Sequence, residues 1–247
     1  DMSINMIREA VSQGIKEVVN TVHYQHPQME HKDLSHSRIC EKLFLLQSEI
    51  EAQGLSVRLH LGTEVYFSNN LNKIKDNPLV TIGNGKYMLI EFPVIQFPPS
   101  FDEILFKLKI EGITPIIAHP ERYRQIQYDI LILSKLVQSG CLVQIDAGSI
   151  MGNFGFEAKK TAIKILQYSL CHIIGSDSHN DKNRNFCLGK VVEICNNELK
   201  INVSKMVNEN PKKILKGELI DSEISLDHSF IKDITIWEKF KFFFGGN

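Results

Sequence analysis

The sequence is poor in the features that mark several large classes of protein. Its 28 basic and 29 acidic side chains give a formal net charge of −1, so it has no general basic field that would attract nucleic acid. No apolar run approaches the roughly 20 residues that span a bilayer, and the first residues do not read as a signal peptide. With 43% hydrophobic residues among 247 and only 8 prolines, the chain is typical of one enzyme domain with a large core.

The cysteines are few and do not have the spacing of a disulfide framework or a redox motif. There are five, an odd number without a Cys-x-x-Cys pair, which favours reduced core thiols and a cytoplasmic location. A cysteine-dependent tyrosine phosphatase needs an arginine six positions after its nucleophile. Those positions here hold Leu46, Ala147, Asp177, Glu193 and Ile201. That class is excluded, and the sequence also has no phosphate-loop, Gly-x-Gly-x-x-Gly or Gly-x-Ser-x-Gly motif.

Helical and strand patterns alternate along the chain. Apolar runs such as Thr-Pro-Ile-Ile-Ala do not alternate with polar residues, as expected of parallel strands that are covered on both faces. Strands are predicted over residues 15–22, 57–63, 87–92, 113–118, 142–146 and 171–176. Helices are predicted over residues 3–13, 34–53, 101–111, 128–139 and 156–168. This succession predicts an α/β fold of the β/α-barrel type.

Side chains that bind metals stand at the downstream ends of the predicted strands. They are His23, Glu64, Glu91, His119, Asp177 and His179. The carboxyl ends of parallel strands meet on one face of a barrel, so these groups are expected to converge. Glu64 and Glu91 follow apolar strands directly, where a carboxylate is costly to bury without a cation or a partner. The set therefore predicts a multinuclear metal centre with nitrogen and oxygen ligands.

Each of these positions also has a plainer interpretation. His23 lies in a stretch rich in histidine, with His26, His31 and His36 nearby, and fits a polar loop residue. Asp177 fits a cap on the turn that follows the last strand. Asp146 also ends a strand, but the following Ala-Gly-Ser predicts a turn, so we interpret it as an outer neighbour of the site. The convergence of several strand ends favours the metal centre.

Around these residues the chain resembles the PHP-type metal-dependent tyrosine phosphatases of the CpsB/YwqE family from bacterial capsule and exopolysaccharide loci. The resemblance rests on Thr-Val-His23, Gly-Thr-Glu64-Val-Tyr, Tyr-Met-Leu-Ile-Glu91-Phe, Ile-Ala-His119-Pro-Glu-Arg122-Tyr, Ser-Asp177-Ser-His179-Asn and Asn-Pro-Lys-Lys-Ile-Leu. It implies a PHP-type distorted (β/α)7, TIM-like barrel. It also implies a phosphatase that acts on a phosphotyrosine-bearing bacterial tyrosine kinase. The implied cofactors are divalent metal ions, with Mn²⁺ expected first and Fe or Zn²⁺ as the other choices.

The resemblance also assigns roles to the ligands. It implies that Glu64 bridges two ions, that Glu91 and His119 complete one site, that Asp177 binds the second ion, and that His23 and His179 hold a third. Family members begin with a strand carrying His-x-His, followed by an Asp-Asp-Gly loop. Neither occurs in this sequence, so the first strand and its metal ligands are expected to be missing from the barrel.

Arg122 and His119 are the two residues expected to act directly in catalysis, the arginine on the phosphoryl group and the histidine through its ion. A guanidinium can present a bidentate fork to phosphoryl oxygens. The alternative for Arg122 is a surface ion pair with Glu121. Arg124 is the second choice for the same role.

Two regions are expected along the chain, a phosphatase barrel over residues 1–220 and an amphipathic, aromatic tail over residues 221–247. The tail carries Trp237, Phe240, Phe243 and Phe244 at near-helical spacing. It either docks on its own domain or makes a peripheral membrane contact. The oligomeric state stays open. Two other functions also stay open, a small-molecule phosphatase of the histidinol-phosphatase kind and a binding module without catalysis.

Overall fold

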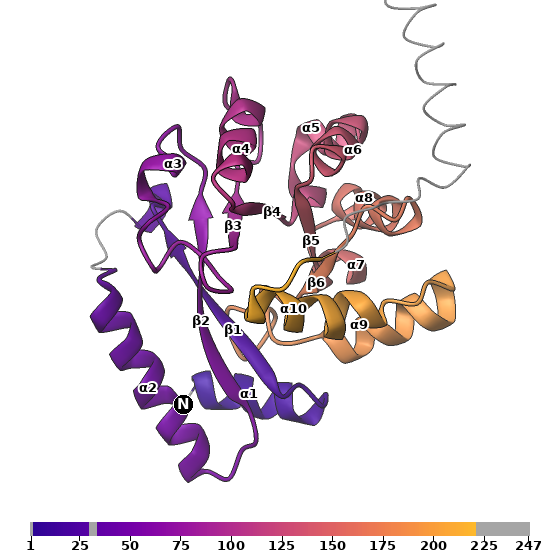
Figure 1. Ribbon diagram of the computed structural model, residues 1–247. Helices are drawn as coiled ribbons and strands as arrows, with labels where there is room; N and C mark the ends of the chain where they lie inside the picture. Colours follow the sequence, from indigo (N-terminus) through magenta and orange to yellow (C-terminus); the bar gives the residue numbers. More distant parts are fainter. Residues whose placement is uncertain (1, 30–33, 221–247) are drawn as a thin grey trace, which may run out of the picture.

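The sheet is the organising element of the fold in the computed structural model, which describes residues 2–29 and 34–220. Six parallel strands form one curled sheet in sequential order (Figure 1). They are β1 (Glu17–Tyr24), β2 (Arg58–Tyr66), β3 (Tyr87–Glu91), β4 (Thr114–Ala118), β5 (Leu142–Asp146) and β6 (Ile173–Gly175). Each strand pairs in parallel with its neighbour, so the carboxyl ends of all six lie along the same edge. The chain thus has an α/β fold in the form of a half-barrel.

Helices connect the strands and pack around the sheet. The α-helices are α1 (Met2–Ser12), α2 (His36–Ala52), α3 (Leu71–Ile74), α4 (Phe101–Ile110), α5 (Arg124–Tyr128), α6 (Leu131–Gln138), α7 (Ala147–Met151), α8 (Phe156–Gln167), α9 (Leu188–Ile194) and α10 (Asn210–Lys216). Short 3-10 turns cover Pro27–Met29 and Pro120–Arg122, and π-helical turns cover Cys195–Leu199 and Lys205–Glu209. Among the described residues, no helix is long and apolar enough to cross a membrane.

The central strands are apolar, and both faces of the sheet are covered there. In β3 all five residues are buried. Met88 and Ile90 pack in the large core under the outer helices, whereas Tyr87 and Leu89 pack in a second core on the opposite face. This division confirms the parallel, doubly covered sheet that the unbroken apolar runs predict.

Several predicted boundaries were wrong for identifiable reasons. The helix expected over residues 128–139 is α6, which begins only at Leu131 because the chain turns at Asp129, whose side chain accepts a hydrogen bond from the Leu131 backbone N–H at 3.1 Å. The short α5 before this turn was not predicted. The first two strands also run further than expected. Their register pairs His23 with Glu64 and continues beyond it, so these two residues lie inside strands and not after them.

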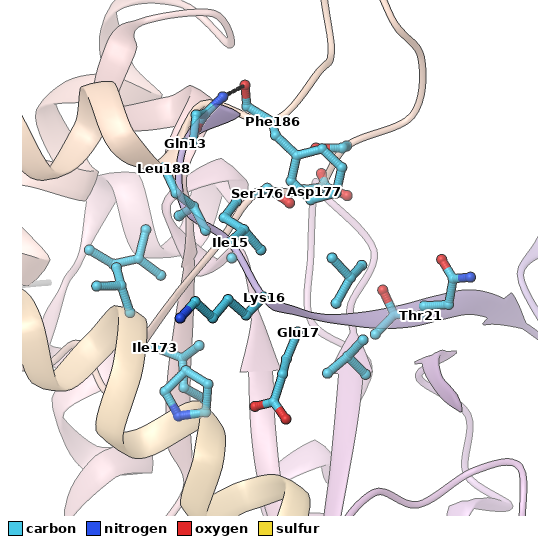
Figure 2. A pocket seen from close by; sticks show the side chains of 18 of the residues that line it. Gln13, Ile15, Lys16, Glu17, Thr21, Ile173, Ser176, Asp177, Phe186 and Leu188 are labelled. Carbon is cyan, nitrogen blue, oxygen red and sulfur yellow. Dashed lines mark hydrogen bonds between the residues drawn. The ribbon is translucent and has the colours of Figure 1, made fainter. Parts of the chain in front are cut away.

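The sheet does not close, and a cavity of about 1150 Å³ separates its edge strands β1 and β6. Figure 2 shows Lys16, Glu17 and Thr21 along one wall and Ile173 on the other. At one end Gln13 donates a hydrogen bond to the backbone oxygen of Phe186 at 2.8 Å. The edges of β1 and β6 are thus the two open edges of the described sheet.

Candidate metal centre

The six expected ligands all line one small cavity at the carboxyl ends of the strands. The cavity has a volume of about 260 Å³. Its wall is formed by His23, His26, Gln28, Glu64, Glu91, His119, Arg122, Asp177, His179 and Arg184. Every one of these side chains is polar or charged. The parallel sheet brings them together from the ends of β1, β2, β3, β4 and β6.

Four of the expected ligands lie in contact with one another, and we call them the metal cluster. They are His23, Glu64, Glu91 and His119. His119 Nε2 lies 3.0 Å from Glu64 Oε1 and 3.6 Å from Glu91 Oε1. His23 Nε2 lies 3.5 Å from Glu64 Oε2. Donor atoms of His23, Glu64 and Glu91 all lie within 4.8 Å of one another. Two donors that share one ion at about 2.1 Å lie about 3 to 3.5 Å apart, so this spacing suits shared cations.

The backbone is strained where it aims two of these ligands. His119 has φ 32° and ψ 53°, and Asp177 has φ 45°, in the left-handed region that residues other than glycine seldom adopt. At the first position the chain leaves β4 and turns at once into the 3-10 turn Pro120–Arg122, which points the imidazole back toward Glu64. Such strain concentrates at functional sites, where the surrounding structure holds it in place.

Burial and mutual charge shift the pKa values of the cluster in a consistent pattern. Burial acts to lower the pKa of His119, but the hydrogen bond and charge of Glu64 outweigh it, so the pKa is raised. Burial acts to raise the pKa of Glu64, and His119 outweighs it in the same way, so that pKa is lowered. Burial, followed by the charge of Glu64, raises the pKa of Glu91. The metal cluster therefore brings two carboxyl groups close together, and the charged form of His119 offsets only part of their mutual repulsion.

A second group, the arginine group, faces the metal cluster and consists of Arg122, Arg184 and Asp177. Asp177 Oδ2 accepts a hydrogen bond from Arg122 Nη1 at 3.0 Å and from Arg184 Nη2 at 2.6 Å. The loop after β6 positions Arg184 because Asn180 Oδ1 accepts the backbone N–H groups of residues 182, 183 and 184. Two guanidinium groups therefore converge on one carboxylate at the wall of the cavity.

A pair of buried carboxyl groups lies behind Arg122. Glu121 Oε1 accepts the backbone N–H of Asp146 at 3.0 Å. Burial, together with the charges of Glu121 and Asp177, raises the pKa of Asp146 to about 8. These surroundings favour the neutral form of the Asp146 carboxyl group. Its nearest oxygen is 3.7 Å from Arg122, so Asp177 is the main anionic partner of that guanidinium.

Three interpretations from the sequence need correction here. Asp146 does not begin a simple turn, because its Oδ1 caps α7 by accepting the Gly148 N–H at 2.7 Å. Arg122 does not form a surface ion pair with Glu121, which is fully buried and bonded to the Asp146 backbone. Arg124 does not line the small cavity, and its residue is exposed.

Sequence reasoning missed three residues of the cavity wall, namely Gln28, Arg184 and His26. Arg184 follows His179 by five positions in the same loop, and the sequence signal that could have found it is a basic residue in the loop after a ligand-bearing strand. His26 was discounted as part of a stretch rich in histidine. Its Nε2 lies 3.5 Å from Glu91 Oε2, and its ring packs against Tyr66 with centroids 5.0 Å apart.

Comparison with known proteins places this geometry in context. CapC of Staphylococcus aureus is 31% identical over 225 residues, which cover 90% of this chain and 86% of CapC. The tyrosine-protein phosphatase YwqE of Bacillus subtilis is 29% identical over 219 residues, covering 88% and 85% of the two chains.

A solved structure extends the likeness to three dimensions. It comes from the crystal structures of YwqE from Bacillus subtilis and CpsB from Streptococcus pneumoniae, described as unique metal-dependent tyrosine phosphatases. The TM-score is 0.81 at 28% identity, with 88% of this chain and 87% of that chain covered. The profile of the family "Capsular polysaccharide synthesis, CpsB/CapC" matches residues 1–216. The chain belongs to the CpsB/CapC family of capsular polysaccharide synthesis.

Proposed function

We propose that this protein is a metal-dependent phosphatase that removes phosphate from phosphotyrosine on a bacterial tyrosine kinase controlling capsule or exopolysaccharide synthesis. One observation carries the proposal. The metal cluster and the arginine group line the same cavity of about 260 Å³, so cation ligands and phosphate-binding cations face each other. The names of the relatives CapC, YwqE and CpsB, together with the structural likeness to metal-dependent tyrosine phosphatases, support the substrate class.

The donor set fits divalent ions. Among the described residues, Glu91 Oε2 and His119 Nδ1 are buried side-chain atoms without a hydrogen-bond partner, and mixed imidazole and carboxylate donors suit Mn²⁺, Fe or Zn²⁺. We assign Glu64 to two ions, Glu91 and His119 to one of them, Asp177 to the other, and His23 with His179 to a third. Mn²⁺ is our first choice. When bound, such ions neutralise phosphoryl charge and lower the pKa of a bound water.

The chain's own residues then bind and orient the substrate. A phosphate monoester is a dianion, and Arg122 and Arg184 can donate several N–H groups to its oxygens from one side of the cavity. Asp177 accepts from both guanidinium groups and so keeps them side by side. All residues of the cavity wall are polar or charged and can contact a phosphoryl group, and none of them is a cysteine that could act as a nucleophile.

We further propose that the fold is the PHP-type (β/α)7 barrel, in which a seventh strand fills the cavity between β1 and β6. The two facing open edges of parallel strands support this assignment. The activity is assigned to residues 1–220, and a cytoplasmic location fits the free cysteines of the described chain. The predicted tail over residues 221–247, with its docking or membrane contact, lies outside the described residues.

The test compares substrates and metal states in one assay. We expect hydrolysis of a phosphotyrosine peptide to stop in excess chelator and to return with added Mn²⁺. Turnover of histidinol phosphate is expected to be much slower. Full activity in chelator would contradict the metal assignment, and faster turnover of histidinol phosphate would move the function to the small-molecule alternative. Metal binding without hydrolysis of either substrate would favour a binding module.

A further inference from the structure

An aromatic ring underlies both guanidinium groups of the arginine group. Phe154 lies in the short connection between α7 and α8, and its ring centroid is 4.6 Å from Arg122 Cζ and 5.2 Å from Arg184 Cζ. These two arginines come from different loops, one after β4 and the other after β6. Among the described residues, Phe154 is therefore the side chain whose ring both guanidinium groups contact.

The local backbone fixes this ring against the arginines. A Cβ at Gly148 would lie 2.9 Å from Phe154 Cε2, so the ring packs on α7 at a point where only glycine leaves room. Gly152 and Gly155 flank the ring with φ of 97° and 92°, conformations that other residues rarely adopt. Asp146 caps the start of α7. The position of Phe154 thus follows from a tightly specified connection.

Two adjacent guanidinium groups need such a support. Like charges repel, and the Asp177 carboxylate that both guanidinium groups contact carries a single negative charge, while Asp146 lies further off at 3.7 Å from Arg122. The face of an aromatic ring carries partial negative charge and attracts cations without adding a competing anion. It also provides a flat surface on which a planar guanidinium stacks, which limits the rotamers of a long side chain. A second carboxylate in the same place would compete with phosphate, whereas a phenyl ring does not.

From this geometry we propose that Phe154 is a positioning residue that holds Arg122 and Arg184 together as a two-guanidinium clamp for a phosphate group. The inference rests on the proposed function because the ligand assigned to the clamp is the phosphate group of a monoester substrate. Phe154 acts through the two arginines and does not itself touch the substrate. Phe154 is an apolar residue, and the positions of the expected metal ligands in the sequence do not point to it.

The test measures binding of inorganic phosphate by titration calorimetry, in the metal-loaded protein and in chelator-treated protein. Phe154→Leu keeps apolar bulk but removes the π face, and we expect phosphate affinity to fall about tenfold. Phe154→Tyr keeps the ring and is expected to stay within about twofold of the wild type. Phe156→Leu is the matched control, because Phe156 is two positions away and 75% exposed, and the cation over its ring is Lys160 and not an arginine of the cavity wall.

A mutant cycle separates positioning from a general structural effect. In a background with Arg122→Gln and Arg184→Gln, we expect Phe154→Leu to cause no further loss of phosphate affinity. Thermal unfolding and metal content are measured for each variant, and Phe154→Met serves as a second apolar variant if Phe154→Leu does not fold. Wild-type phosphate affinity in both apolar variants would overturn the inference. So would an equal loss in the glutamine background, or undetectable phosphate binding by the wild type. A clamp that binds phosphate in a protein without phosphotyrosine turnover would leave the inference intact and contradict the proposed function.

Discussion

The two ends of the same pair of strands carry the same kind of ion pair with different surroundings. At the carboxyl ends of β1 and β2, His23 and Glu64 approach to 3.5 Å, and at the amino ends Glu17 and His60 approach to 3.6 Å. The side chain of Glu64 is 6% exposed, whereas that of Glu17 is 39% exposed. Glu64 also forms an ion pair with His119, whereas the ion-pair partner of Glu17 among the described residues is His60. A histidine–glutamate pair is thus not a site in itself, and burial among further donors makes the difference.

Two buried histidines show the same contrast. His119, at the carboxyl end of β4, and His172, just before β6, are both nearly inaccessible. The pKa of His119 is raised because Glu64 outweighs burial, whereas burial lowers the pKa of His172 to about 4. His172 Nδ1 accepts the Val143 backbone N–H at 3.1 Å, which suits a neutral ring. The surroundings of His119 therefore favour a charged ring, whereas those of His172 favour a neutral one.

The largest expected effect comes from replacing the carboxylate of each ion pair, in turn, by an amide. Glu64→Gln removes the anion shared by two histidines, and we expect metal affinity and phosphatase activity to fall at least about a hundredfold. Glu17→Gln is the control, with metal affinity and activity within about twofold of the wild type, since an exposed ion pair contributes little. Metal titration and turnover of an aryl phosphate measure both. Equal effects of the two substitutions would remove the distinction between the strand ends.

The second prediction concerns acid stability and His172. Its folded pKa of about 4 lies below the ordinary value of 6.5, so the unfolded chain binds more protons between these pH values. Stability from this group is fully present above pH 6.5 and is lost as the pH falls to about 4, by about 3 kcal/mol. His172→Asn keeps an acceptor for the Val143 N–H and does not titrate, so its unfolding free energy is expected to depend less on pH in this window. Denaturant unfolding at several pH values is the measurement, and an unchanged pH dependence would contradict the assignment.

The third prediction concerns Arg122 on the phosphate-binding side. Arg122→Lys keeps the charge but loses the planar fork and the stacking on Phe154, so kcat/KM for an aryl phosphate is expected to fall roughly tenfold, about 1.4 kcal/mol in the barrier. Metal content is expected to stay unchanged. Arg124→Lys is the matched control, because Arg124 is exposed and outside the cavity wall. If Arg122→Lys instead loses metal, the residue belongs to the metal cluster.

The smallest expected effect is that of cysteine alkylation. Burial raises the pKa of Cys141, Cys187 and Cys195 to about 11, so these thiols are protonated at neutral pH, and the cavity wall contains no cysteine. Iodoacetamide is expected to leave phosphatase activity within about twofold. Mass spectrometry shows which thiols react. Loss of activity that follows the modification of one cysteine would place a thiol in the site.

The fold was predictable from the sequence wherever the pattern was local. The alternation of helical and strand patterns identified all six described strands, and the convergence of the expected ligands followed from the rule that parallel strands share a carboxyl edge. The start of α6 was predicted three residues too early because the turn at Asp129 depends on a side-chain hydrogen bond that hydrophobic periodicity does not show.

Only the part of the candidate site that stands at the ends of strands could be predicted from the sequence. Arg184 and Phe154 lie in loops whose path depends on tertiary contacts, namely the Asn180 hydrogen bonds and the packing on Gly148. The opposite behaviour of His119 and His172 was also out of reach, since both border apolar strands. Their pKa shifts depend on whether a carboxylate comes close from another strand, which the fold decides.

The most direct test of the account is a crystal structure of the protein with Mn²⁺ and phosphate, with the metal located by anomalous scattering. We expect an anomalous peak between Glu64, Glu91 and His119, with phosphate in contact with Arg122 and Arg184. Metal at the carboxyl ends together with phosphate on the arginines would support the account. Ordered phosphate elsewhere, or no metal peak at the metal cluster in Mn²⁺-saturated crystals, would contradict it.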